Sequence, residues 1–215
     1  MSKTAHIVLG APDEHAVYPS PLSDDIVIGV DRGAFLCLER NINLDIAVGD
    51  FDSISLEEKE ALQATGALFQ EHESDKDDTD AEIALSLAMK DDTIHHIRLY
   101  NWAGGRLDHL MSIVYMVHQP RFLKKISSVT LVNQINTIRF FEPGTYTLKK
   151  EPSKKYLSFV CMTPVEKLTL KNVKYTLDRK TYTYPAALVS NEFLEQHCEF
   201  SFEKGIMAVI QSSDK

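Results

Sequence analysis

The sequence predicts an α/β domain, with a mostly parallel sheet and helices on both of its faces, followed by a small all-β sandwich. Up to residue 134, short apolar runs alternate with amphipathic stretches of helical spacing, and after it only short β-branched or aromatic runs occur. Charge changes at the same place: residues 1–134 carry 11 basic and 22 acidic side chains, a net −11, whereas residues 135–215 carry 12 and 9, a net +3. We therefore expect one domain over 1–134 and a second over 135–215.

Five apolar runs in the first domain are expected to be buried strands, because each is short and bounded by polar or turn-forming residues. They are Ala5–Leu9, Asp25–Val30, Ile46–Val48, His96–Tyr100 and Val129–Val132. Strands that alternate with helices form mostly parallel sheets, since a parallel pair needs a long crossover connection. This alternation is the basis of the α/β prediction.

Three helices are expected between these strands. Two of them begin at a capping box, in which a Ser or Thr and a Glu three residues later exchange hydrogen bonds. One box joins Ser55 and Glu58, and the other joins Thr79 and Glu82. The third helix is predicted over Leu107–Val117, whose apolar residues recur at helical spacing.

The second domain is predicted to be a sandwich of short strands separated by turns that contain Pro and Gly. The expected strands are Thr137–Phe141, Thr145–Leu148, Tyr156–Cys161, Lys167–Leu170, Val173–Leu177, Thr181–Tyr184 and Ile206–Ile210. The helical period disappears in this part of the sequence, which favours two packed sheets.

Composition excludes several classes of protein. With 215 residues, of which 44% are hydrophobic and 25% charged, the chain is typical of a globular protein. A net charge of −8 argues against a nucleic-acid-binding protein, which usually carries a basic excess. The sequence has no signal-peptide pattern and no run of about 20 apolar residues, so we expect a cytoplasmic protein without a membrane partner. Cys37, Cys161 and Cys198 are odd in number and far apart, which predicts buried free thiols, with a thiol nucleophile as the less favoured alternative.

The residues that directly follow the predicted strands are the candidates for a ligand site, because an open α/β sheet binds ligands beyond the carboxyl ends of its strands. The second strand is followed by Asp31 and Arg32, and the third by Asp50 and Asp52. In extended backbone, Asp50 and Asp52 would project from one face about 7 Å apart at Cα, close enough to share a hard cation. A helix cap is the alternative for Asp31, and a solvated acidic turn is the alternative for the pair.

An acidic segment precedes the second predicted helix. A solvated loop, with carboxylates at the positive end of the helix dipole, accounts for the charges before residue 76. Thr79 would cap the helix, which would fix Asp77 and Asp80 at the mouth of the same crevice. Lys76 beside them suits a site that binds a metal together with phosphate.

The segment after the strand His96–Tyr100 is suited to anions. Gly104 and Gly105 precede a helix, so free backbone N–H groups and the helix dipole can bind phosphate, and Arg106 can form two hydrogen bonds to its oxygens. The spacing matches neither the P-loop nor the dinucleotide fingerprint. His109 is either a ligand contact or a capping residue.

With these residues assembled, the sequence resembles the thiamine pyrophosphokinase (thiamine diphosphokinase) family. The matching segments follow the order of the family over most of the chain: Asp31–Ala34, Gly49–Ile54, Lys76–Asp80 with Glu82, Ala84 and Leu85, Gly104–His109, Lys174–Leu177 and Val189–Phe193. Two features depart from the family. Thr176 replaces a Pro, and the single tryptophan, Trp102, lies in the first domain.

The resemblance implies an N-terminal domain that binds ATP, a C-terminal β-sandwich, and a homodimer with thiamine bound near the interface. It also implies a Mg²⁺-dependent transfer of pyrophosphate from ATP to the hydroxyl of thiamine, giving thiamine diphosphate and AMP.

The resemblance assigns roles to particular residues. The implied catalytic residues are Asp31, Asp50, Asp52, Asp77 and Asp80. Of these, Asp50, Asp52 and Asp80 would hold Mg²⁺, with Asp77 as an alternative ligand, and Asp31 would act as general base or orient the substrate. The implied ATP-binding residues are Arg32, Lys76, Thr79, Gly104, Gly105, Arg106, Asp108 and His109. Ser190 and Asn191 would contact the thiamine pyrimidine, and the candidates to stack on it are Tyr175, Tyr182 and Tyr184.

Other functions remain open at this point. A diphosphotransferase for another alcohol, such as a pterin, would keep the metal residues and change the acceptor pocket. A metal-dependent phosphohydrolase would use water as the acceptor. A non-catalytic sensor of nucleotide or thiamine fits less well, because a sensor need not keep so many clustered carboxylates.

Overall fold

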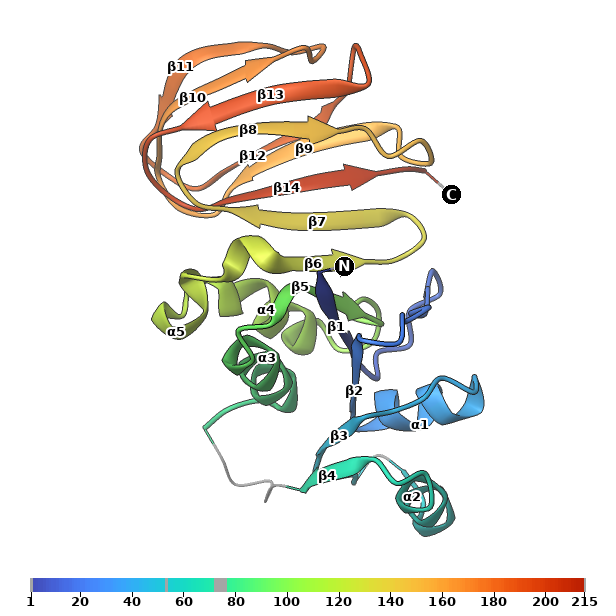
Figure 1. Cartoon of the computed structure of the whole chain (residues 1–215). Helices are drawn as coiled ribbons and strands as arrows, with labels where there is room; N and C mark the ends of the chain where they lie inside the picture. Colours follow the sequence, from blue (N-terminus) through green and yellow to red (C-terminus); the bar gives the residue numbers. More distant parts are fainter. Residues whose placement is uncertain (1, 53, 72–76, 215) are drawn as a thin grey trace. The chain divides into compact units, whose positions relative to one another are not determined.

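The computed structural model describes residues 2–52, 54–71 and 77–214. The chain divides into two compact units, Met1–Asn133 and Gln134–Lys215, so the division falls one residue before the expected boundary. Each unit has its own strands (Figure 1). Buried clusters of hydrophobic side chains lie within the first unit and within the second.

The sheet of the first unit has parallel strands in the order β6-β5-β1-β2-β3-β4. They are β1 (Lys3–Val8), β2 (Ile26–Val30), β3 (Ile46–Gly49), β4 (Leu68–Glu71), β5 (Ile94–Tyr100) and β6 (Val129–Val132). The sequence predicts all of these except β4, in which only Leu68 and Phe69 are apolar. Strands β2 to β4 extend to one side of β1, and β5 and β6 extend to the other. A ligand crevice is expected at this reversal of strand order, beyond the carboxyl ends of β1 and β5.

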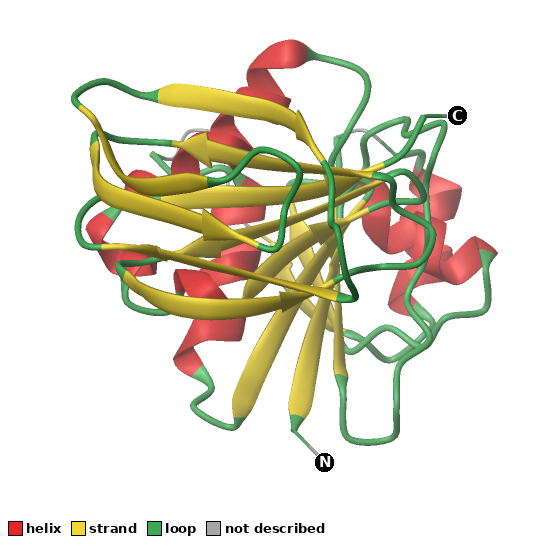
Figure 2. Cartoon of the chain, turned by 90° about the horizontal axis from the view of Figure 1, so that it is seen from above, coloured by secondary structure: helices red, strands yellow, loops and turns green. Residues whose placement is uncertain are grey.

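Helices lie on both faces of this sheet (Figure 2), which confirms the predicted α/β class. They are α1 (Arg32–Glu39), α2 (Leu56–Gln63), α3 (Asp80–Lys90), α4 (Leu107–Tyr115) and α5 (Pro120–Leu123), with 3-10 turns η1 (Met116–His118) and η2 (Ile126–Ser128). Both predicted capping boxes are present, at Ser55 and at Thr79. The predicted third helix is two residues too long, because the chain tightens into η1 after Tyr115. Within the described residues, no helix combines the length and the hydropathy needed to cross a membrane.

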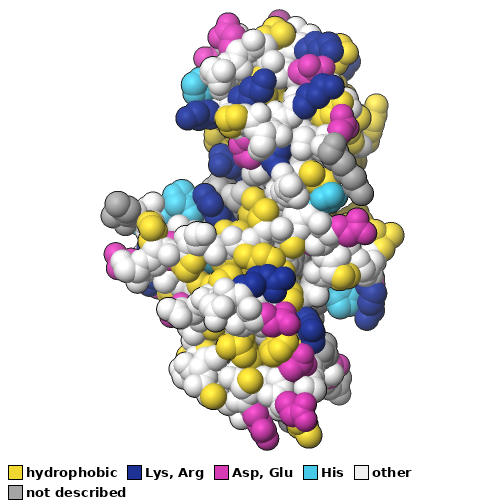
Figure 3. Space-filling view, turned by 90° about the vertical axis from the view of Figure 1, so that its right-hand side faces the viewer, with side chains coloured by type: hydrophobic (Ala, Val, Ile, Leu, Met, Phe, Trp, Pro, Cys, Tyr) yellow, Lys and Arg dark blue, Asp and Glu magenta, His cyan; other side chains and the backbone are white. Residues whose placement is uncertain are grey.

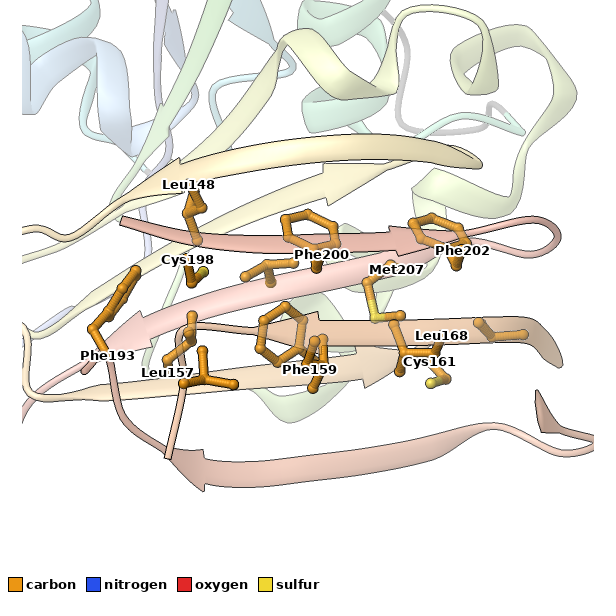
Figure 4. Close-up of a cluster of buried hydrophobic side chains, with 14 residues drawn as sticks. Leu148, Leu157, Phe159, Cys161, Leu168, Phe193, Cys198, Phe200, Phe202 and Met207 are labelled. Carbon is orange, nitrogen blue, oxygen red and sulfur yellow. The ribbon is translucent and has the colours of Figure 1, made fainter. Parts of the chain in front are cut away.

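The second unit consists of two antiparallel sheets, ordered β12-β9-β14-β7 and β11-β10-β13-β8. The strands are β7 (Asn136–Phe141), β8 (Gly144–Lys149), β9 (Tyr156–Cys161), β10 (Val165–Lys171), β11 (Leu177–Tyr182), β12 (Ala186–Asn191), β13 (His197–Phe202) and β14 (Met207–Ser212). Side chains from both sheets form one core (Figure 4). In it, Phe200 lies edge-on to Phe159, with 5.4 Å between the ring centroids. The predicted β-sandwich is confirmed.

Some strand predictions in this unit are wrong. Where the strands Val173–Leu177 and Thr181–Tyr184 are predicted, the structure has a single strand, β11, over Leu177–Tyr182. Val173 forms only an isolated bridge with Phe193, and residues 174–176 lie outside any strand. Asn172 has a left-handed φ of 58°, which ends the extended backbone of β10. The sequence does not predict β12 or β13, since small and polar residues interrupt their apolar pattern.

Surface charge differs between the two units, as their compositions require. On the face shown in Figure 3, acidic side chains gather over the lower part of the molecule, where α2 lies. Lys and Arg lie among acidic side chains over the sandwich. The excess of carboxylates is therefore a property of the α/β unit.

The three cysteines are free and buried, as the sequence predicts. Burial raises the pKa of the Cys37 thiol to about 12, and those of Cys161 and Cys198 to about 11. A thiol with such a pKa is protonated at neutral pH and is a poor nucleophile. This argues against the alternative of a catalytic thiol.

A buried polar cluster joins β1 to β5. The Nδ1 atom of His6 lies 2.9 Å from the hydroxyl of Tyr100, and its Nε2 atom lies 3.3 Å from Oδ2 of Asp25. Burial lowers the pKa of His6 below 6.5, although the hydrogen bond and charge of Asp25 act to raise it. Burial acts to raise the pKa of Asp25, but hydrogen bonds from the N–H groups of Leu22 and Thr4, and from His6, hold it below 3.8.

We expect the free energy of unfolding to fall as the pH is lowered below about 6.5. His6 takes up a proton at a higher pH in the unfolded chain than in the folded one, so its contribution is complete above pH 6.5 and is lost below it. Asp25 adds a second loss below pH 3.8 by the same reasoning. Urea denaturation at about pH 7.5 and about pH 5.5 measures the effect. A His6→Gln variant should show a weaker pH dependence, and an equal dependence in both proteins would contradict this role.

Candidate active site

A cleft of about 840 Å³ lies beyond the carboxyl ends of the strands of the first unit. Its lining residues lie within five segments, 9–12, 30–32, 50–52, 77–81 and 101–113, at or after the ends of β1 to β5. This is the place that the reversal of strand order at β1 predicts for a ligand.

The cleft brings together most of the residues that the sequence singles out. Those that line it are Asp31, Arg32, Asp50, Asp52, Asp77, Thr79, Asp80, Gly104, Gly105, Arg106, Asp108 and His109. Lys76 lies outside the described residues. Ser190 and Asn191 belong to the second unit.

Asp31 precedes α1 in a backbone conformation that is rare for a residue with a side chain, φ 46° and ψ −121°. Asp31 occupies the N-cap position of α1, but within the described residues its side chain makes no capping hydrogen bond. The neighbouring Gly49 has φ 146°, and a Cβ atom on it would lie 1.8 Å from Oδ1 of Asp31. Only glycine leaves room for the Asp31 carboxylate at this point.

Four carboxylates interact at the cleft. The pKa of Asp31 is raised from 3.8 to about 7, first by burial and then by the negative charges of Asp80, Asp50 and Asp52. A hydrogen bond from the Phe51 N–H acts in the opposite direction. The negative electrostatic potential of these four carboxylates therefore stabilises a bound cation or a proton.

Asp50 and Asp52 are joined by a tight turn, and the expectation of extended backbone between them is wrong. Phe51 has φ 57°, and Oδ1 of Asp50 accepts a hydrogen bond from the N–H of Asp52 over 3.1 Å. The Phe51 side chain is buried and packs beside Phe69, with 5.4 Å between the ring centroids. The ring anchors the turn, while both carboxylates stay at the cleft.

The segment that carries Asp77 and Asp80 is held at two points. Thr79 caps α3 through its capping box. Asp78 forms a two-pronged ion pair with Arg121 of α5, with distances of 2.6 Å and 2.7 Å between nitrogen and oxygen. Sequence reasoning misses this pair because 43 residues separate its members.

Gly104 and Gly105 turn the chain from β5 into α4. Their φ angles of 88° and 68° are left-handed. A Cβ atom on Gly104 would lie 2.6 Å from the carbonyl oxygen of Pro12, so the turn packs closely on the loop after β1. The two glycines thus place backbone N–H groups at the start of a helix and beside the cleft.

Arg32 and Arg106, the two arginines predicted to bind phosphate, are each paired with a carboxylate of the chain. Arg32 lies 3.1 Å from Glu58, and Arg106 lies 2.6 Å from Asp108. The guanidinium groups remain accessible, with side chains 40% and 71% exposed. A phosphate can therefore bind them by replacing one anionic partner with another.

Sequence reasoning also misses Asn101 and Trp102, which directly follow β5 at the reversal of strand order. Asn101 is buried, has φ 51°, and donates from Nδ2 to the hydroxyl of Tyr18 over 3.1 Å. Oδ1 of Asn101, Nε1 of Trp102 and Oδ1 of Asp31 are buried without a hydrogen-bond partner, alone among the side-chain atoms of the described residues. An unpaired buried polar atom costs about 1–3 kcal/mol. All three residues line the cleft, so the unpaired polar groups are concentrated there.

The acidic residues fit a hard divalent cation by the chemistry of their donors. Carboxylate oxygen is the ligand that Mg²⁺ takes from proteins, and it usually binds through one or two carboxylates plus substrate phosphates. Burial and then the charges of the neighbouring carboxylates raise the pKa of Asp31, and such a cation would relieve the repulsion among these carboxylates. In the part of the chain that the structure describes, no three His, Cys, Asp or Glu side chains form a ready-made metal site. Phosphates of a bound nucleotide can complete the coordination of such an ion.

A second hollow, of about 700 Å³, lies on the second unit and includes Ser190. Its other lining residues are Asn136, Lys155, Tyr156, Ser158, Val189, Glu192, Ile210, Ser212 and Asp214. Ser190 is exposed and has a left-handed φ of 60°. Its side chain is available to a ligand in this hollow.

Asn191 lies next to Ser190 in the sequence but is only 5% exposed. Its Oδ1 accepts hydrogen bonds from the N–H groups of Tyr175 and Glu192, and its Nδ2 donates to the carbonyl of Tyr175, each over 2.9 Å. The side chain therefore ties the turn before β11 to the end of β12.

The three tyrosines proposed to stack on thiamine lie in different surroundings. Tyr182 packs against the core of the sandwich, whereas Tyr175 and Tyr184 are largely exposed. The tyrosine that lines the hollow at Ser190 is Tyr156. Its hydroxyl donates to Asp214 over 2.8 Å.

Comparison with known sequences points to one family. Residues 22–130 match the family model of the thiamin pyrophosphokinase catalytic domain, and residues 145–207 match that of the thiamin pyrophosphokinase vitamin B1 binding domain. A thiamine pyrophosphokinase from Bacillus subtilis is 31% identical over 99% of this chain and 100% of its own length. Neither a pterin-specific transferase nor a non-catalytic sensor is favoured by these matches.

Solved structures give the same result. A thiamin pyrophosphokinase family protein from Enterococcus faecalis is 38% identical, with a TM-score of 0.94 over 100% of both chains. Thiamine pyrophosphokinase from Bacillus subtilis has a TM-score of 0.86 and 31% identity over 99% of this chain and 100% of that one. The two family models, the full-length relative and these structures agree with the fold and the resemblance found above, and the chain belongs to the thiamin pyrophosphokinase family.

Proposed function

We propose that this chain transfers the pyrophosphoryl group of ATP to the hydroxyl of thiamine, with thiamine diphosphate and AMP as products. The observation that carries the proposal is the match of two family models within one chain. One covers most of the unit with the carboxylate-lined cleft, and the other covers most of the unit with the hollow at Ser190. The cleft suits phosphates and a cation, and the hollow suits the acceptor, thiamine.

In this reaction the thiamine hydroxyl oxygen attacks the β-phosphorus of ATP. The bond from the β-phosphorus to the oxygen it shares with the α-phosphate breaks, and AMP leaves with that oxygen and its electron pair. Negative charge is spread over phosphate oxygens, so the protein contributes mainly by positioning and by electrostatic stabilisation. We assign to Asp31 the orientation of the attacking hydroxyl and the acceptance of its proton, since Asp31 has a buried oxygen without a partner among the described residues.

Asp50, Asp52 and Asp80 are proposed to hold Mg²⁺, with Asp77 as an alternative ligand. Bound there, the ion would neutralise charge on the phosphate oxygens. The proposal is supported by the all-carboxylate donor set and by the negative charges of Asp80, Asp50 and Asp52, which raise the pKa of Asp31 beyond the effect of its burial.

The phosphates of ATP are proposed to bind at the turn formed by Gly104 and Gly105, where backbone N–H groups meet the start of α4. Arg32 and Arg106 would exchange their present carboxylate partners for phosphate oxygens. The other proposed ATP contacts are Lys76, Thr79, Asp108 and His109.

Ser190 is proposed to contact the pyrimidine of thiamine. For Asn191 we propose a supporting role, because its side-chain oxygen and nitrogen are already bound to backbone groups. We also propose a cytoplasmic location, which three free and buried cysteines suit, since disulfides are rare in that reducing compartment.

A homodimer is proposed, formed through the sandwich. Large apolar side chains that are 59–67% exposed lie in and around β12: Tyr175, Tyr184, Val189 and Leu194. Exposed apolar groups close together are typical of interaction surfaces.

Purified protein supplied with ATP and Mg²⁺ is expected to release AMP only when thiamine is added, because attack at the β-phosphorus needs the thiamine hydroxyl. EDTA should abolish the release. Chromatographic measurement of AMP and thiamine diphosphate checks both expectations. AMP or pyrophosphate released equally well without thiamine would replace the proposal with a hydrolase, and a preference for a pterin alcohol would change the acceptor.

Asp50→Asn and Asp52→Asn are each expected to lower kcat/KM by about 100-fold or more, because metal-assisted charge stabilisation contributes several kcal/mol. Thermal unfolding should be unchanged or shifted to higher temperature, since each variant removes a repelling charge. Asp178→Asn, at an exposed position on β11, is the matched control and should keep full activity. Full activity in both cleft variants would contradict the metal assignment.

Sedimentation velocity is expected to show a particle of twice the 24.3 kDa chain mass. A Val189→Lys, Leu194→Lys double variant should shift the population toward monomer, because two charges would be buried on association. Leu56→Lys, at a highly exposed position on α2, is the control and should remain dimeric. A monomeric unaltered protein at micromolar concentration would refute the dimer.

A further inference from the structure

Ser158 lies on β9 in none of the motifs described above, and we propose that it positions the thiamine-binding segment of β12. The inference rests on the proposed function, because it takes Ser190 as the thiamine contact. Ser158 acts through the backbone of Ser190, so it is a positioning residue.

A bulge in β12 lies opposite Ser158. Leu188 and Asn191 of β12 pair with the two neighbours of Ser158 on β9. Two residues of β12, Val189 and Ser190, therefore stand opposite one residue of β9. Ser190 accommodates the extra residue of the bulge by adopting a left-handed φ of 60°. A bulge of this kind bends the strand and changes the direction in which a side chain points.

The Ser158 hydroxyl completes the hydrogen bonding that the bulge interrupts. The N–H of Ser190 donates to Oγ of Ser158 over 3.2 Å, in place of a carbonyl of the neighbouring strand. Ser158 is only 7% exposed, so water has little access to replace this acceptor. Without the hydroxyl, the N–H of Ser190 would lose its partner, and the left-handed conformation of Ser190 would lose the contact that holds it.

This hydrogen bond forms part of the wall of the second hollow. Ser158, Val189 and Ser190 all line it. The direction of the Ser190 side chain is set by its backbone conformation, which the Ser158 hydroxyl stabilises. A change at Ser158 should therefore alter the binding of thiamine without altering the cleft of the first unit.

The sandwich uses the same kind of hydrogen bond at two further left-handed residues, which provide matched controls. Arg179, with φ 49°, donates its N–H to Oγ1 of Thr169 over 3.1 Å. Lys167, with φ 56°, donates to Oγ1 of Thr181 over 3.2 Å. Both bonds join β10 to β11 in the other sheet, and none of these four residues is among the described residues that line the hollow.

The test compares Ser158→Ala with Thr169→Ala in the thiamine-dependent AMP assay. In Ser158→Ala, the KM for thiamine is expected to rise about three- to tenfold, the effect of one lost hydrogen bond, while the KM for ATP stays unchanged. Ser158→Thr keeps the hydroxyl and should restore the KM. Thr169→Ala should lower the melting temperature by an amount similar to Ser158→Ala, but with both KM values unchanged. Calorimetric titration of thiamine gives a Kd that does not depend on turnover.

Four results would count against the inference, and the last of them also counts against the proposed function. A thiamine KM and Kd in Ser158→Ala equal to those of the unaltered protein would overturn it, and so would an equal rise in Thr169→Ala. If Ser158→Ala does not fold, Ser158→Cys, a weaker acceptor of similar size, must raise the thiamine KM by an intermediate amount, and an unchanged KM would again overturn the inference. Absence of thiamine-dependent AMP release in the unaltered protein is a distinct result, which would overturn the proposed function and the role of Ser158 together.

Discussion

The carboxylates gathered at the carboxyl edge of the parallel sheet repel one another, and this repulsion is the constraint that the packing of the first unit has to overcome. Parallel strands all end on the same side, so acidic residues placed after β2, β3 and β4 are brought together by the fold itself. Asp31 fits there only because its backbone is left-handed and its neighbour is Gly49. Phe51 fixes the adjoining turn by burying its ring. Packing therefore holds the charges in place before any ligand neutralises them, which is the preorganisation that phosphoryl transfer uses.

The cations near this edge belong to two groups. Arg32 and Arg106 line the cleft, and each has a carboxylate partner on an exposed surface, where ion pairs contribute little to stability. Arg121 lies on α5 and donates hydrogen bonds to the Asp78 carboxylate from both terminal guanidinium nitrogens. The geometry thus distinguishes two roles. Arg32 and Arg106 can exchange their carboxylate partners for groups of a substrate, whereas Arg121 supports the segment beside α3. Removal of Arg121 would act on the carboxylates of that segment and not directly on phosphate.

The features that could be predicted from the sequence are those with local signals. The capping box at Thr79 and the alternation of apolar runs fix helices and strands over a few residues, and the position of an acidic residue just after a strand locates the cleft. The structure departs where distant residues or unusual backbone are involved. The left-handed conformation of Phe51 cannot be recognised from the alternation of apolar and polar residues in the sequence. Arg121 and Asp78 are brought into contact only by the tertiary fold. Asn191 is predicted to bind thiamine because of the motif in which it lies. Its side chain instead forms hydrogen bonds with the backbone of Tyr175, in a segment that is predicted to be a strand.

The hydroxyl-bonded bulges of the sandwich have a consequence for solubility. Strands β11 and β12 are edges of their sheets, and a flat edge strand can pair with an edge of another chain. Each of the two carries a left-handed residue, Arg179 on β11 and Ser190 on β12, bonded to a hydroxyl of the adjacent strand. A bent edge cannot accept a long, in-register partner strand. The irregularity that shapes the hollow at Ser190 thereby also blocks the open-ended β-pairing that leads to fibrils.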